Sequence, residues 1–257
     1  MDLLGEIELF DSHLHIIDPR FPLIPNHGYL PEAFTCDDYL ARLSQYKLVG
    51  GVVVSGSFQG FDQSYLLSAL KSLGASYVGV TQLPYATSDQ QIMQLDAAGV
   101  RALRFNLYRG GSENVKHMVS MAHRVYDRVG WHVELYVDAT KLEELSVILN
   151  QLPAVCIDHL GMSKQGLPYL LKLAEKGVKI KATGFGRIDF KASEAIRLLY
   201  LANPESLMFG SDLPSTRAPI PFQHSDIDIV LETLGGEAAQ NVFKENAMTF
   251  YNLKSRE

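Results

Sequence analysis

The feature of this sequence that most constrains its fold is a regular alternation of short β-rich runs with longer runs of helical periodicity. Strands are expected at residues 7–15, 49–55, 77–82, 100–107, 132–137, 154–159, 178–183 and 207–212. Helices are expected at 62–74, 88–99, 112–130, 140–152, 166–177 and 191–203, and several of these end on Gly. Repeated βα units imply a parallel sheet. Eight such units in 257 residues predict an α/β fold, a (β/α)8 TIM barrel, as a single domain over residues 1–257.

An open, doubly wound sheet is the alternative fold. The first strand is not followed by the GxGxxG turn that is typical of dinucleotide-binding folds of that kind. The run HVELYVD at 132–138 also suits a barrel, because its side chains alternate between two faces. Val133, Leu135 and Val137 would face the outer helices, and His132, Glu134 and Tyr136 would face the lumen. A polar lumen face is consistent with a functional site inside the barrel.

Charge and cysteine content limit the partners and the compartment. The formal net charge is -6, the pI is about 5.8, and no dense Lys/Arg run occurs, so nucleic acid and anionic membranes are not expected as partners. Cys36 and Cys156 form no paired framework, and neither a secretory signal nor a membrane-spanning run is apparent. The sequence therefore predicts a cytoplasmic protein that acts on a small molecule and leaves the oligomeric state open.

Polar residues stand where the expected strands end. In FDSHLH, His13 and His15 are two residues apart and would project from the same face of a strand. His159 ends the sixth expected strand and Asp212 ends the eighth. Each has a structural explanation by itself, since an Asp after a strand is often a helix N-cap. A barrel, however, would bring all four to the C-terminal mouth, where such enzymes keep their active groups.

Several quoted segments resemble a known family: FDSHLH, VRALRFNLY, GWHVELYVDA, VCIDHLG, FGSDLP and ENAMTFYNL. They are similar to the amidohydrolase superfamily in its amidohydrolase-related branch (amidohydrolase 2), and most of all to the 2-pyrone-4,6-dicarboxylate lactonases and related TIM-barrel hydrolases. This resemblance implies a hydrolase that opens a small carboxylated lactone or related cyclic ester.

The resemblance also bears on metal content. Binuclear members use further ligands on strands 4 and 5, where this chain has Arg104, Asn106 and Tyr136, and His132 lies at the wrong end of its strand. The lactonase relatives are understood to need no metal, so no cofactor is expected. The alternative is one divalent ion such as Zn²⁺, held by His13, His15, His159 and Asp212.

The residue types suggest a mechanism. Asp212 is the expected general base for water, and His13, His15 and His159 are expected to polarise the carbonyl. Arginine pairs well with carboxylates, so Arg104, Arg109 and Arg187 predict an acidic substrate, with Ser57 at a neighbouring strand end. By resemblance, Tyr29 and Tyr136 line the pocket. The chain departs from the family's pattern at Met162, at the shorter loop bearing Arg109, and at GSDLPS, which Arg217 follows.

Two alternatives remain open at this stage. One is a metal-dependent decarboxylase of the same branch, which uses a similar His and Asp set around a firmly bound ion. The other is a barrel that binds a ligand without catalysis. Metal content and the presence of a working base would separate them.

Overall fold

The predicted barrel is confirmed by a computed structural model that describes residues 7–253. Its strands are β1 (Glu8–Leu14), β2 (Lys47–Val54), β3 (Tyr77–Thr81), β4 (Val100–Asn106), β5 (His132–Tyr136), β6 (Val155–Ile157), β7 (Lys179–Ala182) and β8 (Leu207–Phe209). They form one eight-stranded sheet in the order β1 to β8, with every neighbouring pair parallel. All eight expected strands are present, each within a few residues of its predicted range.

The barrel closes where the segment after β8 meets β1. The amide of Asp212 donates to the carbonyl of His13 over 2.8 Å, and the amide of His15 donates to the carbonyl of Leu213 over 2.7 Å. Two segments that are about 200 residues apart in sequence are therefore hydrogen-bonded at the C-terminal mouth.

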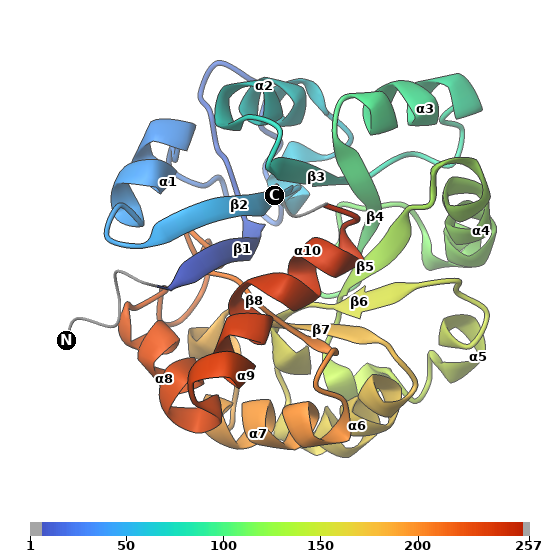
Figure 1. Ribbon diagram of the computed structural model, residues 1–257. Coiled ribbons are helices and arrows are strands. Elements are labelled where there is room, and N and C mark those ends of the chain that lie inside the picture. The colour runs from blue at the N-terminus through green and yellow to red at the C-terminus, as the bar shows by residue number, and fades with distance from the viewer. Residues whose placement is uncertain (1–6, 254–257) are drawn as a thin grey trace.

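The helices surround the sheet (Figure 1). They are α1 (Cys36–Arg42), α2 (Ser64–Leu73), α3 (Asp89–Ala97), α4 (Met118–Val129), α5 (Ser146–Leu149), α6 (Leu167–Glu175), α7 (Ala192–Ala202), α8 (Ser225–Leu234), α9 (Gly236–Gln240) and α10 (Asn246–Phe250). Short helical turns are η2 (Ser57–Gln59), η3 (Val115–His117), η4 (Ala139–Lys141), η5 (His159–Gly161), η6 (Lys164–Gly166), η7 (Phe185–Arg187) and η8 (Asn241–Glu245).

One expected helix differs from the structure. The segment 140–152 was predicted as a single helix, but it forms the turn η4 and the four-residue α5. The Asp138 side chain accepts a hydrogen bond from the amide of Thr140, and this starts a tight 3-10 turn in place of an α-helix. The other five expected helices are present.

Two apolar layers hold the barrel. The outer layer, between strands and helices, includes Val133, Leu135 and Val137, as the alternation of β5 predicted. The inner layer fills the lumen with side chains such as Phe10 and Met208 and reaches α10. Figure 1 shows α10, in red, lying across one opening of the barrel. Because His132, the first residue of β5, lies against Phe250 and Tyr251 at the end of α10, this opening is the N-terminal one, opposite the site described below.

Within residues 7–253, no helix combines the length and the apolar character needed to cross a membrane. Both cysteines are free thiols, and Cys156 is buried in the lumen, where it packs as a small apolar side chain.

Candidate active site

The two sequence motifs FDSH and GSD interlock at the C-terminal mouth. Ser211 donates to Asp11 from both its hydroxyl (2.6 Å) and its amide (2.8 Å). Gly210 allows this close approach of the two segments, because a β-carbon at this position would lie 2.6 Å from the backbone nitrogen of His13. Asp11 therefore joins the end of β8 to β1, and this connection places Asp212 next to His13 and His15.

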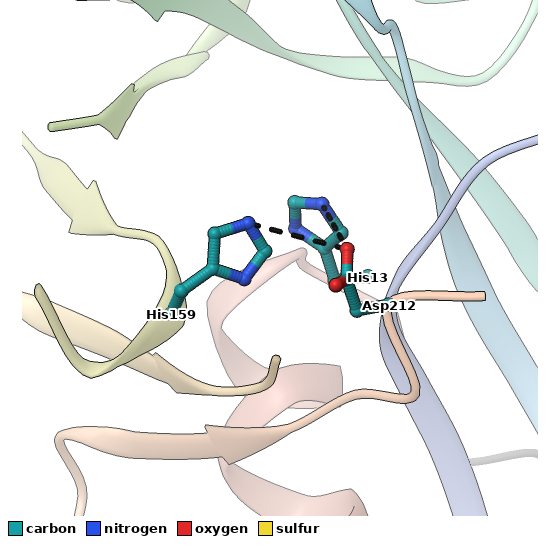
Figure 2. Close-up of side chains that lie close together, drawn as sticks. All are labelled: His13, His159 and Asp212. Carbon is teal, nitrogen blue, oxygen red and sulfur yellow. Dashed lines mark ion pairs between the residues drawn. The ribbon is translucent and has the colours of Figure 1, made fainter. Parts of the chain in front are cut away.

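His13, His15, His159 and Asp212 come together as the sequence predicted. The Asp212 Oδ1 atom lies 3.9 Å from His13 Nε2, 3.8 Å from His15 Nε2 and 4.0 Å from His159 Nε2. All four residues are buried. Figure 2 shows the rings of His13 and His159 and the carboxylate of Asp212 pointing toward one another.

Two of these residues hold strained backbone conformations. His159 has a φ of 53° and Asp212 a φ of 59°, the left-handed region that side chains other than glycine rarely adopt. Such strain persists only where the surrounding structure enforces it, and it concentrates at functional sites. Here the enforcing contact for Asp212 is its amide hydrogen bond to His13.

The second ring nitrogen of each histidine decides what the first can do. His15 Nδ1 lies 2.7 Å from the carbonyl oxygen of Val54, which can only accept, so Nδ1 carries the proton and Nε2 keeps a lone pair. His159 Nδ1 lies 2.8 Å from the hydroxyl of Thr183, which can either donate or accept.

Burial sets the charge state of the cluster. Burial, reinforced by Lys181, holds the pKa of His13 well below its usual value. Burial, with Arg104 adding to it, lowers the pKa of His15 to about 3. Burial and Arg187 hold the pKa of His159 well below its usual value. Burial raises the pKa of Asp212, which Arg187 opposes by donating to Oδ2 over 2.7 Å. Neutral imidazoles thus surround a carboxyl group whose ionised form Arg187 stabilises.

The cluster has the donor types of a single metal site. Ligand atoms of His13, His159 and Asp212 lie within 4.8 Å of one another, and His15 Nε2 adds a fourth ligand atom near the carboxylate oxygen of Asp212. His13 Nε2 and Asp212 Oδ1 are buried and have no hydrogen-bond partner among the described residues. Imidazole nitrogens and a carboxylate suit Zn²⁺, so these residues fit one divalent ion. His132 lies near Phe250 and Tyr251, at the other end of the barrel, as predicted.

A pocket opens above the cluster and encloses about 330 Å³, counting the part open to solvent. Its lining residues are His15, Gly56, Ser57, Phe58, Arg104, Asn106, Arg109, Tyr136, His159, Arg187, Thr216 and Arg217. Five of the six predicted substrate-binding residues are among them. Tyr29, the sixth, lies under Arg217, whose guanidinium carbon is 4.6 Å from the centre of the tyrosine ring.

Several polar contacts at the site were not predicted from the sequence. Arg104 donates from Nη2 to Asp158 over 2.8 Å, and Lys181 donates to Glu134 over 2.6 Å. Arg217, which lines the pocket, donates to Ser57 over 2.9 Å. A signal existed for Lys181, because it stands between the buried apolar residues Ile180 and Ala182 of β7.

The chain is similar to known proteins of one family. The amidohydrolase family model matches residues 10–253. A 2-pyrone-4,6-dicarboxylate hydrolase of Comamonas testosteroni is 32% identical over 160 residues, which cover 59% of this chain and only 51% of that relative. A D-galactarolactone isomerase of Agrobacterium fabrum is 23% identical over 95% of this chain and 90% of its own length.

Solved structures include a putative 2-pyrone-4,6-dicarboxylic acid hydrolase from Pseudomonas putida. It is 25% identical, with a TM-score of 0.82 over 96% of this chain and 98% of that one. Since the family model spans nearly the whole of the described structure, the chain belongs to the amidohydrolase family.

Proposed function

We propose that this protein is a hydrolase that opens the ester bond of a small carboxylated lactone. The observation that carries the proposal is the position of Asp212, whose free carboxylate oxygen faces three neutral imidazoles at the foot of an arginine-lined pocket. A carboxylate can take a proton from water, and ring N–H groups can stabilise the oxygen that becomes negative.

The chemistry follows from these groups. Asp212 Oδ1 accepts a proton from water as the water oxygen attacks the lactone carbonyl carbon. An imidazole N–H stabilises the resulting oxyanion. When the tetrahedral intermediate collapses, the ring C–O bond breaks and the leaving oxygen takes up the proton from Asp212. The product is an open-chain compound with a new hydroxyl or enol and a new carboxylic acid group, which then releases its proton to water.

Arg187 supports the base. It donates from Nε to Asp212 Oδ2 and from Nη2 to the carbonyl oxygen of Thr216, at 2.9 Å. The guanidinium therefore fixes the carboxylate plane and leaves Oδ1 as the oxygen that faces the pocket. This pairing also opposes burial, because Arg187 lowers the pKa of Asp212 that burial raises.

No metal is part of this proposed mechanism. If one divalent ion were bound, His13, His159 and Asp212 would hold it, with His15 as a further ligand, and it would supply Lewis-acid polarisation of the carbonyl and a more acidic water. The chain's own part would be unchanged: the arginines bind the substrate, and the buried cluster excludes bulk water.

The substrate class rests on charge. Four arginines, Arg104, Arg109, Arg187 and Arg217, line one small pocket of an acidic protein. Guanidinium groups bind carboxylates through parallel hydrogen bonds, so an anionic substrate is expected. The names of two relatives, a pyrone dicarboxylate hydrolase and a galactarolactone isomerase, both concern acidic lactones and support the same class. A small-molecule partner and a cytoplasmic location belong to this proposal.

A lactone panel tests the function. It should contain 2-pyrone-4,6-dicarboxylate, D-galactarolactone and muconolactone-type carboxylates, each assayed with and without chelator while metal content is measured. Hydrolysis of a carboxylated member that survives chelation supports the proposal. Decarboxylation that requires a firmly bound ion would favour the decarboxylase alternative, and tight binding without turnover would favour a binding barrel.

A further inference from the structure

A buried lysine lies directly beneath the active-site cluster. Lys181, on β7, is fully buried in the lumen. Its Nζ atom lies 2.6 Å from Glu134 Oε2, 3.4 Å from His13 Nδ1 and 3.9 Å from Asp158 Oδ1. The ammonium thus stands between three groups, His13, Glu134 and Asp158, that would otherwise make a second cluster of potential metal ligands.

His13 Nδ1 has two polar neighbours at the same distance. Lys181 Nζ and Asp158 Oδ1 are each 3.4 Å away. An ammonium has only donors, so a bond from Lys181 requires a lone pair on Nδ1; a carboxylate has only acceptors, so a bond to Asp158 requires a proton there. The two neighbours therefore favour opposite tautomers of the same ring.

The geometry favours the lysine. Lys181 Nζ is hydrogen-bonded to His13 Nδ1, whereas Asp158 Oδ1 has no hydrogen-bond partner among the described residues. Lys181 is also held in place from the other side, because its bond to Glu134 joins two fully buried charges. Asp158, in turn, is engaged by Arg104 through its other oxygen.

We propose that Lys181 is a positioning residue that fixes His13 in the tautomer with its proton on Nε2. His13 then presents an N–H toward Asp212 Oδ1 and the pocket, while His15 presents a lone pair there because Val54 holds its Nδ1 proton. The two histidines of one HxH motif thus have opposite roles. Resting on the proposed function, this assigns His13 as the donor to the developing oxyanion.

The assignment also concerns metal binding. A ring nitrogen that carries a proton has no lone pair for an ion. His13 could therefore bind an ion together with His159 and Asp212 only if the proton left its Nε2 atom.

Nitrogen NMR reads the tautomer directly and needs no substrate. The protein, labelled with ¹⁵N-histidine and freed of metal by chelator, gives ring ¹⁵N–¹H correlations from its eight histidines, and His13 is identified by its loss in His13→Gln. We expect the Nε2–H form in the wild type. Lys181→Met should shift His13 toward the Nδ1–H form, which bonds to Asp158, whereas the matched control Glu134→Gln keeps the lysine and should keep the wild-type tautomer.

Kinetics add a second readout. Lys181→Met should lower kcat for an accepted lactone by roughly 10²-fold, the scale of a lost oxyanion donor, with little change in KM. If Lys181→Met alone fails to fold, Lys181→Met/Glu134→Gln removes both buried charges and should show the same tautomer shift. An Nδ1–H form in the wild type, or an unchanged tautomer without Lys181, overturns the proposal. Failure to hydrolyse any lactone would overturn the proposed function but not the tautomer assignment.

Discussion

The guanidinium of Arg187 donates to one oxygen of Asp212 over 2.7 Å, while the other oxygen of that carboxylate faces three imidazoles at 3.8–4.0 Å. In the Asp212 carboxylate, Oδ2 is therefore held by Arg187, and Oδ1 is the oxygen that can react. Arg187 also lines the substrate pocket, so the residue that holds the base is in a position to contact the substrate.

Replacing Asp212 by Asn tests the base. The variant keeps the size of the side chain and loses proton acceptance, so kcat should fall by roughly 10²-fold or more. Circular dichroism should show an intact fold, and metal content should be measured in parallel to separate a lost base from a lost ligand. Near wild-type turnover by this variant would remove Asp212 from the mechanism.

The pH profile tests the Arg187–Asp212 pair. A general base works only when it is deprotonated, so activity falls as the pH drops through the pKa of Asp212. Burial raises this pKa and Arg187 lowers it. Arg187→Gln removes the lowering influence, so the acidic limb of kcat should move to higher pH. A limb that stays in place, or that moves to lower pH, would show that Arg187 does not control the base.

Arg217 is the clearest test of substrate charge, because it lines the pocket and pairs with no carboxylate among the described residues. Arg217→Gln should raise KM for a carboxylated lactone by about tenfold or more, since one charge-assisted contact is lost, and should leave kcat nearly unchanged. The matched control is Arg128→Gln, on α4, where Arg128 pairs with Asp89 and is 58% exposed. Equal KM values in both variants would place substrate recognition elsewhere.

Arg104 should matter for stability as well as for binding. Arg104 and Asp158 are both buried and hydrogen-bonded over 2.8 Å. Arg104→Met leaves Asp158 without its partner, so urea denaturation should show a free energy of unfolding lower by about 3–5 kcal/mol, the usual cost of breaking a buried pair. Arg104→Met/Asp158→Asn should recover part of that loss. The exposed Arg20, which pairs with Asp18 at the surface, provides the comparison, and Arg20→Met should lower the free energy of unfolding much less.

The barrel and the four-residue cluster follow from local sequence patterns. Strand and helix periodicity depends on near neighbours in the chain, so eight βα units predict the fold and place His13, His15, His159 and Asp212 at one mouth. The alternation in HVELYVD likewise predicted that Glu134 faces the inside of the barrel, but it did not predict which cation pairs with Glu134.

The pairing of charges was decided by the tertiary structure alone. Arg104 and Asp158 are 54 residues apart, and Glu134 and Lys181 are 47 apart. Which lumen side chains meet depends on strand register and on how the closed barrel staggers its strands, and neither is encoded in any local window. The sequence could therefore show that arginines and carboxylates face the same lumen. Only barrel closure assigned Arg187 to Asp212 and set Lys181 beneath His13, because short-range side-chain bonds form only after distant strands have been brought into register.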